Sequence, residues 1–290
     1  MNRDRLLVVA IVALSLVAIA AHFSSSATEY GRDNHQWNGT SQFFGAADRH
    51  GSVSLFEYDL LPDQPGTMLL IIAPGEEYAD AEIQACSDFL GAGNTIFIAD
   101  DGRHSNKLLE QLGCSVSIVP ARLMSIDRAF THPDSILGYT ERSDDMTEGV
   151  SAVVLNRPSY VTGGEALINT SILTWEEKNG NHVVDADENL TNYAIFSRDT
   201  VNNGTVYILS DPSIFINGMQ SLDAEDNPRF ILNVLETPEQ ILIDQVHCGS
   251  AGIAGAGSTA YLPYSGLLIE IIATVCSIAC IIYLFYSKIF

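Results

Sequence analysis

Two short apolar runs, residues 68–73 and 95–99, enclose a segment whose apolar residues recur at helical spacing. This order of strand, helix and strand is typical of a βαβ unit with parallel strands. Because both runs are apolar throughout, we expect a sheet that is covered on both faces. The loops after the strands then open at the carboxyl edge of the sheet, where α/β folds bind their ligands.

The same patterns predict further elements on both sides of this unit. A helix is expected after Thr40 and Ser41, with Phe43 and Phe44 facing inward. Other helices are predicted near residues 108–112 and 227–235, and other strands at residues 53–58, 116–119, 150–155, 166–173, 193–197, 205–209 and 241–246. The periodicity is weak between residues 120 and 149. Strands that alternate with helices indicate an α/β sandwich with a mostly parallel sheet.

Apolar segments near both ends of the chain predict a membrane protein. Residues 6–23 carry no charge, and residues 267–286 carry only Glu270. Since roughly 20 apolar residues span a bilayer, residues 265–287 are predicted to form a transmembrane helix. Residues 1–23 form a second anchor or, because Ala18-Ile19-Ala20 resembles a signal-peptidase site, a signal peptide that is removed. A retained anchor is the favoured interpretation.

Charges orient the chain in the membrane. Arg3, Arg5 and Lys288 flank the apolar segments, so the positive-inside rule predicts that both termini are cytoplasmic. The main domain, residues 24–247, is then extracytoplasmic, and residues 248–264 form a linker rich in Gly, Ala and Ser. The chain has 36 acidic and 14 basic residues, a formal net charge of −22. This acidity argues against nucleic acid or anionic lipid as a partner and favours a solvated acidic surface.

Two residue types bear on the compartment of the main domain. Four sequons agree with an exported, glycosylated domain, at Asn38, Asn169, Asn189 and Asn203. The domain also holds three cysteines, Cys86, Cys114 and Cys248, so at most one intrachain disulfide can form. Cys86 and Cys114 would be the pair, but buried, unbridged thiols are the favoured interpretation.

Polar residues follow two of the predicted core strands. One group comes after residue 99 and the other after residue 209, so both would meet at the carboxyl edge of a parallel sheet. Together they predict a polar ligand pocket of Asp100, Asp101, Arg103, His104, Asn106, Asp211 and Asn217, with Asp226 as a further member. The alternative is that the acidic residues cap helix N-termini and the loop is simply exposed.

Residues 177–188 match the spacing of a twelve-residue calcium-binding loop. Its oxygen ligands would be the side chains of Glu177, Asn179, Asn181, Asp185 and Glu188 and the backbone carbonyl of Val183. Two features depart from the pattern, because the first ligand is Glu and His182 replaces the usual Gly, although His tolerates the left-handed region better than most residues. An ordinary hairpin loop is the alternative. Ca²⁺ is the one cofactor considered, since the histidines lack zinc spacing and no phosphate loop is present.

Three segments of the main domain carry a family resemblance. They are APGEEYADAEIQACSDFLGAGNTIFIADDG, ADDGRHSNKLLEQLG and SDPSIFINGMQSLDAEDNPRFILNVL, the last with an Asp at a strand end, then Asn, then Asp-Asn before a helix. In these features the chain resembles an archaeal family of membrane-anchored proteins of unknown function, related to the auxiliary component of gliding-motility-type ABC transporters. The resemblance covers residues 37–247 and the flanking membrane helices. It implies a flavodoxin-like sheet, similar in fold to class I glutamine amidotransferases.

The resemblance does not extend to amidotransferase chemistry. Such a site needs a nucleophilic Cys on a tight strand-to-helix turn, oriented by His and an acid. The turns after residues 73 and 99 read PGE and DGR and offer neither Cys nor Ser. We therefore expect a non-enzymatic binding or scaffolding module in the cell membrane, with a membrane or envelope protein as partner. The alternative hypothesis is an extracytoplasmic hydrolase that uses Asp100, Asp101 and Asp211, with or without a metal.

Overall fold

The computed structural model describes residues 15, 28–222 and 224–248, and Glu29–Ala251 belong to one compact unit. Apart from residue 15, both predicted membrane segments lie outside the described residues, as does the predicted linker after residue 248. Among the residues described, no helix has the length and apolar character needed to cross a bilayer. In the same part of the chain, one sheet has eleven strands and a second sheet has two.

The centre of the main sheet is parallel, as predicted. In spatial order its strands are β1 (Val53–Leu55), β13 (Gln240–Asp244), β2 (Thr67–Ile72), β3 (Thr95–Ala99) and β12 (Gly204–Leu209). The predicted βαβ unit is confirmed: β2 leads through α3 (Asp80–Gly91) into β3, which lies beside β2 in parallel. The carboxyl ends of these strands therefore share one edge.

Beyond β12 the sheet is antiparallel, which corrects the expectation of a mostly parallel sheet for this half. It continues through β11 (Ala194–Val201), β9 (Glu165–Thr170), β6 (Ser135–Thr140) and β7 (Ala152–Asn156), while β8 (Tyr160–Thr162) pairs with β11 and with β4 (Ser117–Val119). The connections explain the direction. A tight turn at Asn202, which has a φ of 54°, joins β11 to β12, and so short a loop joins only antiparallel neighbours.

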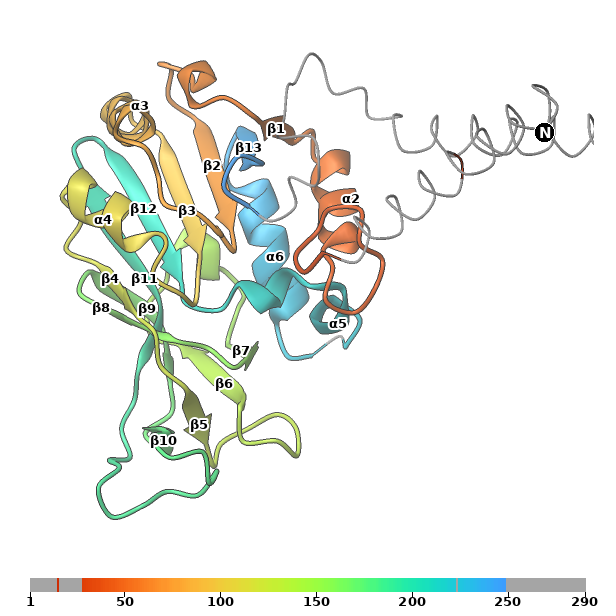
Figure 1. The fold of residues 1–290 in the computed structure, drawn as a ribbon, viewed down its shortest axis with the longest axis vertical. Helices are drawn as coiled ribbons and strands as arrows, with labels where there is room; N and C mark the ends of the chain where they lie inside the picture. Colours follow the sequence, from red (N-terminus) through yellow and green to blue (C-terminus); the bar gives the residue numbers. More distant parts are fainter. Residues whose placement is uncertain (1–14, 16–27, 223, 249–290) are drawn as a thin grey trace, which may run out of the picture. The chain divides into compact units, whose positions relative to one another are not determined.

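Helices cover both faces of the parallel strands (Figure 1). Side chains of α2 (Ser41–Arg49) and α6 (Asn227–Glu236) pack into one core, and those of α3 and α4 (Asn106–Leu112) into the other. Residues of β2 alternate between the two cores, with Met68, Leu70 and Ile72 in the first and Leu69 and Ile71 in the second. This two-sided burial explains why the strand is apolar throughout. The other helices between residues 28 and 248 are short: η1 (Tyr58–Leu60), η2 (Asp145–Thr147), η3 (Pro212–Phe215) and α5 (Asn217–Gln220).

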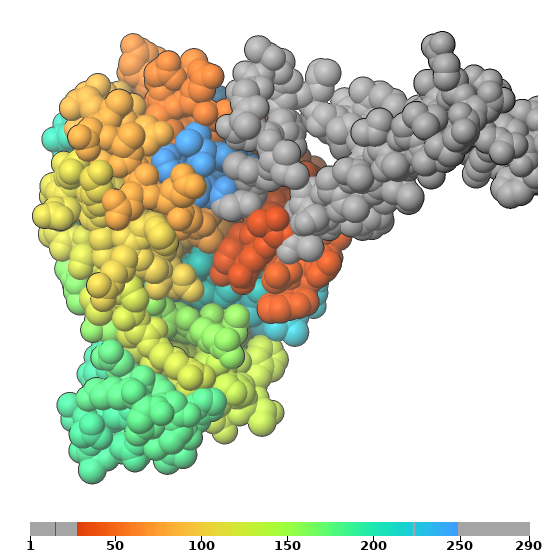
Figure 2. All heavy atoms as spheres, in the orientation of Figure 1, coloured from red at the N-terminus to blue at the C-terminus, as the bar shows by residue number. Residues whose placement is uncertain are grey.

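The two-stranded sheet forms a projection that the sequence pattern did not predict. It pairs β5 (Leu123–Ser125) with β10 (Thr174–Glu176), and residues 177–191 follow β10. We call β5, β10 and residues 177–191 the lobe. Figures 1 and 2 show it at the lower end of the domain, away from the helices. Because β5 and β10 have only three residues each, their apolar periodicity is too short to recognise in the sequence.

The three cysteines of the domain are free, so the pairing of Cys86 with Cys114 was wrong. The carboxylate of Asp244 in β13 lies near Cys86, whereas that of Asp199 in β11 lies near Cys114. Three strands separate β13 from β11 in the sheet. The favoured interpretation, buried thiols, is confirmed for Cys86 and Cys248, and burial raises the pKa of both.

Candidate functional site

The carboxyl edge of the parallel strands brings together three of the predicted pocket residues. Asp100 follows β3 and Asp211 follows its neighbour β12, in which Leu209 pairs with Ala99. Burial and then the carboxylate of Asp100 raise the pKa of Asp101. Burial raises the pKa of Asp211 to about 7, and Asp101 adds to this shift. The three carboxyl groups are thus electrostatic neighbours.

Two of these carboxylates are occupied by backbone groups. Asp100, which is 2% exposed, accepts from Gly102 N at 2.7 Å and from Ser105 N at 3.0 Å, and it shapes the turn into α4. Asp211, which is 1% exposed, accepts from Asn156 N at 2.7 Å and from Ser213 N at 2.9 Å. The Ser213 hydroxyl is a further donor to it. Asp101 is the exposed member of the three.

The other predicted pocket residues do not join this group. Asn106 bonds both to the N–H and to the C=O of Ile118, which fixes β4 against α4. Asn217 accepts from Gln42 N at 2.9 Å and donates to the carbonyls of Asn34 and Gln36, so it holds the segment before α2 against α5. Arg103 and His104 are exposed. The side chains of Asn106 and Asn217 thus form hydrogen bonds to the backbone of neighbouring segments.

The outer edge of β7 is closed by side chains in place of a further strand. Asp226 accepts from Ser151 N at 2.7 Å and Ala152 N at 3.2 Å. Asn227 pairs with both backbone groups of Val154. Asn156 N donates to Asp211, and the Ser213 hydroxyl donates to Asn156 O at 3.2 Å. The Asp and Asn residues of the third family-like segment therefore complete the hydrogen bonding of an edge strand.

The sequence pattern did not predict that the segment with Glu29 and Tyr30 lies beside the carboxyl edge. No element was predicted for this segment, yet Tyr30 N donates to Asn38 O at 2.9 Å and its ring packs against the core. Burial raises the pKa of the Tyr30 hydroxyl, and the nearby Asp211 and Asp101 raise it further. The segment is polar and has no periodicity, so no pattern in the sequence indicated this contact.

A buried ion cluster lies at the end of β13 and was also missed. The His247 ring lies between two carboxylates, with Nδ1 3.2 Å from Asp244 and Nε2 3.2 Å from Glu82. It stacks on Tyr78, whose ring centroid is 4.0 Å away, and meets the ring of Tyr58 edge-on. Burial alone would lower the pKa of His247, but the two carboxylates outweigh burial and raise it. The rule that polar residues gather at strand ends could have found Asp244 and His247.

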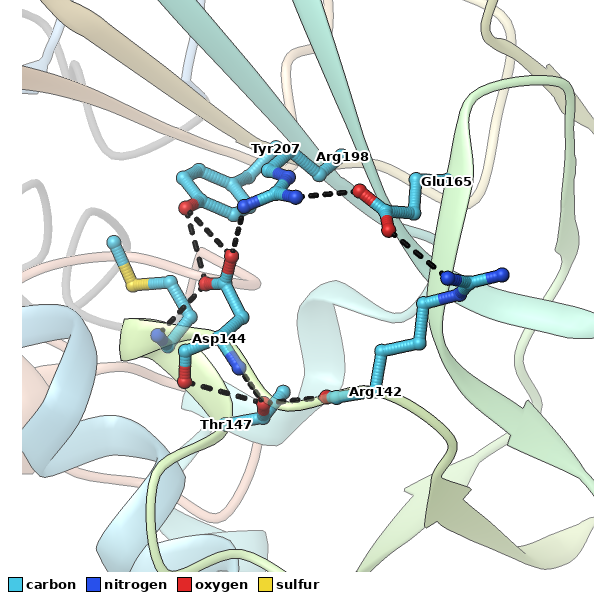
Figure 3. Close-up of polar contacts among 7 residues, drawn as sticks. Arg142, Asp144, Thr147, Glu165, Arg198 and Tyr207 are labelled. Atoms are coloured by element: carbon cyan, nitrogen blue, oxygen red, sulfur yellow. Dashed lines mark hydrogen bonds and ion pairs between the residues drawn. The ribbon is translucent and has the colours of Figure 1, made fainter.

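A second polar network spans the antiparallel half (Figure 3). Arg198 in β11 binds Asp144 at 2.7 Å and Glu165 in β9 at 2.5 Å, and Tyr207 in β12 donates to Asp144 at 3.0 Å. Arg142 approaches the other oxygen of Glu165 at 3.3 Å. The bond to Glu165 raises the pKa of Arg198. The network fastens the start of η2 to three strands and balances each charge with an opposite one.

The predicted calcium loop closes on itself through its ligand candidates. Asn179 and Asn181 both point at Asp185, with Nδ2 to Oδ2 distances of 2.5 and 2.7 Å. Glu177 accepts from Gly180 N and His182 N, among others, and Glu188 accepts from Lys178 N and Asp185 N. His182 has a φ of 64°, the left-handed conformation that its place in the loop requires. The carbonyl of Val183 lies in the same loop.

Comparison with known proteins identifies the family. A family model described as a domain of unknown function (DUF4350) matches residues 32–235. The chain belongs to this family. Similar solved structures include the mmIFT52 N-terminal domain (17% identity, 58% of this chain, 75% of that chain, TM-score 0.44) and the cytoplasmic protein STM1381 from Salmonella typhimurium LT2 (16% identity, 70% and 89%, TM-score 0.43). These likenesses are too weak to carry a functional argument. No curated protein matches the chain.

The polar residues of this DUF4350 domain that looked functional mostly support its backbone. Asp100, Asp211, Asn106 and Asn217 each satisfy peptide groups of a turn, an edge strand or a neighbouring segment. Among the described residues, no three His, Cys, Asp or Glu side chains gather as a metal site. Calcium in the 177–188 loop would therefore depend on the Asn amides and the Val183 carbonyl as well as on the carboxylates.

Proposed function

We propose that this domain is a membrane-anchored, extracytoplasmic binding and scaffolding module without catalytic activity, which works in an envelope or ABC-transport-type complex. The apolar segments near both ends of the sequence support the anchoring. The resemblance to the auxiliary component of gliding-motility-type ABC transporters, with its amidotransferase-like fold, supports the type of complex. A membrane or envelope protein would be the partner.

One observation carries the proposal that the module is not an enzyme. Asp100 and Asp211, two of the three candidate carboxylates of a hydrolase, accept backbone N–H groups on both carboxyl oxygens and are 2% and 1% exposed. A carboxylate-dependent hydrolase needs two carboxyl groups that reach the substrate. Of the three candidates for such a pair, only Asp101 is exposed. These hydrogen bonds fix the loops at the carboxyl edge of the sheet, and a fixed surface suits a scaffold.

The test is cross-linking in intact cells with a reagent that does not cross membranes, followed by purification in mild detergent. The control keeps residues 1–28 and 249–290 but carries an unrelated globular domain between them. We expect the full chain, and not the control, to recover a transporter subunit or another envelope protein. Equal recovery by both chains, or no membrane partner with either, would contradict the proposed function.

We further propose that a calcium ion organises the lobe. The donor set fits, because Ca²⁺ takes six to eight hard oxygen ligands and the loop offers carboxylate, amide and carbonyl oxygens. Glu177 and Glu188 are each 7% exposed and accept backbone N–H groups within the loop. Asn179 and Asn181 donate their amide N–H groups to Asp185, so an ion would require these two amides to turn their oxygens toward it. These residues would hold the ion, which would supply charge compensation for the three carboxylates.

Calcium titration of the full chain tests this second proposal. Calcium should raise the midpoint of thermal unfolding, because an ion that binds only the folded state stabilises it. Asp185→Asn and Glu188→Gln should abolish the rise, whereas Asp187→Asn removes the same charge without removing a ligand and should keep it. Extracellular calcium modules bind with dissociation constants of about 10⁻⁴–10⁻³ M, so no rise at several millimolar calcium would contradict the site.

A further inference from the structure

The four sequons differ sharply in how the fold presents them. Transfer of a glycan requires that the asparagine amide nitrogen and the hydroxyl of the second residue after it are both accessible, and the product must leave room for a bulky, hydrated group. A sequon inside a paired strand or under a buried hydroxyl cannot meet these conditions. The structure therefore allows the four to be ranked by their surroundings.

Two of the sequons are locked into the fold. Asn169 lies within β9, paired to Tyr139 on one side and to Ala194 on the other, and its side-chain oxygen is buried. The Asn38 side chain accepts from Asn34 Nδ2 at 3.1 Å. The hydroxyl residue of that sequon, Thr40, is 0% exposed and donates to Tyr30 O. A glycan at Asn169 would meet the two neighbouring strands, and transfer to Asn38 would require Thr40 to leave its buried position.

The third sequon is exposed at its asparagine, but its hydroxyl residue lies within a paired strand. Asn203 sits in the turn between β11 and β12, and its Nδ2, the atom that would receive the sugar, donates to Gly91 O at 3.1 Å. Thr205 lies in β12, paired to Thr95 of β3 and to Thr200 of β11. A transferase could not draw this segment into an extended conformation without separating strands.

The fourth sequon meets every condition. Asn189 directly follows the calcium-loop residue Glu188, is exposed, and makes no hydrogen bond within the described part of the chain. Leu190 is 43% exposed. Thr191 is also exposed, and among the described residues it bonds only through its backbone, in a β-bridge to Thr174. The segment belongs to the lobe, which stands clear of the helices (Figure 2).

We propose that Asn189 is the N-glycan acceptor site of the folded domain. The substrate is a glycosyl donor activated as a lipid-linked diphosphate. The Nδ2 atom of Asn189 would form a bond to the anomeric carbon of the sugar, the carbon–oxygen bond to the diphosphate would break, and the amide would lose one proton to a base of the transferase. The lipid diphosphate is the leaving group. In the cell this modification rests on the proposed extracytoplasmic placement, but presentation by the fold does not.

The test is transfer in vitro to the folded, detergent-solubilised full chain, with an oligosaccharyltransferase and lipid-linked oligosaccharide, read by intact mass and glycopeptide sequencing. The folded chain should gain one glycan, at Asn189, and Asn189→Gln and Thr191→Ala should gain none, while Thr191→Ser keeps the site. Peptides of the unfolded chain should be modified at other sequons as well. A positive control is Glu141→Asn, which adds a sequon with Ser143 at exposed positions.

Two outcomes overturn the proposal. One is a folded chain modified at Asn38 or Asn169. The other is a folded Glu141→Asn chain modified at the new sequon but not at Asn189. The Glu141→Asn variant expressed in a glycosylating host separates this proposal from the proposed function. Suppose that Asn189 and the new sequon are both modified in vitro but neither is modified in the cell. The extracytoplasmic placement then fails, and the presentation of Asn189 by the fold stands.

Discussion

The side chain of Asn227 binds Val154 as a neighbouring strand would. Its Oδ1 accepts from Val154 N at 2.7 Å, and its Nδ2 donates to Val154 O at 2.9 Å. Both residues are buried. One amide side chain at the start of α6 thus satisfies two backbone groups on the outermost strand of the sheet and fixes the helix to that strand.

Asn227→Ala should therefore destabilise the domain strongly. It leaves a buried N–H and a buried C=O without partners, each costing about 1–3 kcal/mol, so we expect the free energy of unfolding to fall by about 2–5 kcal/mol. Urea denaturation followed by circular dichroism measures this loss. Asn189→Ala, at an exposed asparagine without hydrogen bonds, is the control and should change stability by less than about 0.5 kcal/mol. Similar values for the two variants would refute the role of Asn227.

The Arg198 network gives a second pair of variants. The Asp144 side chain is 2% exposed, so Asp144→Ala leaves the buried Tyr207 hydroxyl without an acceptor and removes one of the two carboxylate partners of Arg198. We expect a loss of about 1–3 kcal/mol in the free energy of unfolding. The Arg142 side chain is 63% exposed, and its ion pair with Glu165 is screened by water, so Arg142→Ala should cost about 0–1 kcal/mol. Equal losses would show that the network does not anchor η2.

Asp211 makes stability depend on pH in the acidic range. Its pKa in the folded chain is raised from 3.8 to about 7. The folded state therefore holds this proton more tightly than the unfolded state, and the stabilisation is fully present below about pH 4 and is lost as pH rises through about 7. Asp211→Asn should flatten this part of the profile of unfolding free energy against pH. A profile that the substitution leaves unchanged would show that Asp211 is ionised in the fold.

His247 also makes the folded state less stable as pH rises, but at higher pH than Asp211 does. Burial disfavours its charged form, but Asp244 and Glu82 raise its pKa overall in the folded chain. Its contribution to stability is fully present below its ordinary pKa of 6.5 and is lost as pH rises through the raised value. His247→Gln should remove the decline above pH 6.5, and Glu82→Gln should shift it to lower pH. Thermal unfolding at a series of pH values, with His35→Gln as an exposed histidine control, tests this expectation.

The sequence predicted the parts of the fold that depend on local periodicity. β2, α3 and β3 were recognised because each has a full apolar face. The direction of the second half of the sheet was not predicted, because it depends on the tight turn at Asn202 and on pairings between distant strands. The short strands β5, β8 and β10 are below the length at which periodicity is informative.

In the candidate site, too, the features set by local sequence were predicted and those set by contacts between distant strands were not. Strand-end logic placed Asp100, Asp101 and Asp211 at one edge, and in the structure Asp101 raises the pKa of Asp211 as Asp100 raises that of Asp101. It did not foresee that the partners of Asp211 would be Asn156 and Ser213, since the position of β7 is a property of the whole sheet. Glu82 and His247 are separated by 165 positions in the chain, and only the parallel pairing of β13 with β2 brings them within reach.

The two ends of the described domain are fastened at the same edge of the sheet, and this has a mechanical consequence. Asn217, just after η3, holds the first end through the carbonyls of Asn34 and Gln36, and Cys248, at the last, forms a backbone β-bridge with Pro74 after β2. A pull applied to the chain before Tyr30 and after Cys248 would act across this one edge. The lobe, which holds neither attachment point, would then lie outside the path of the force.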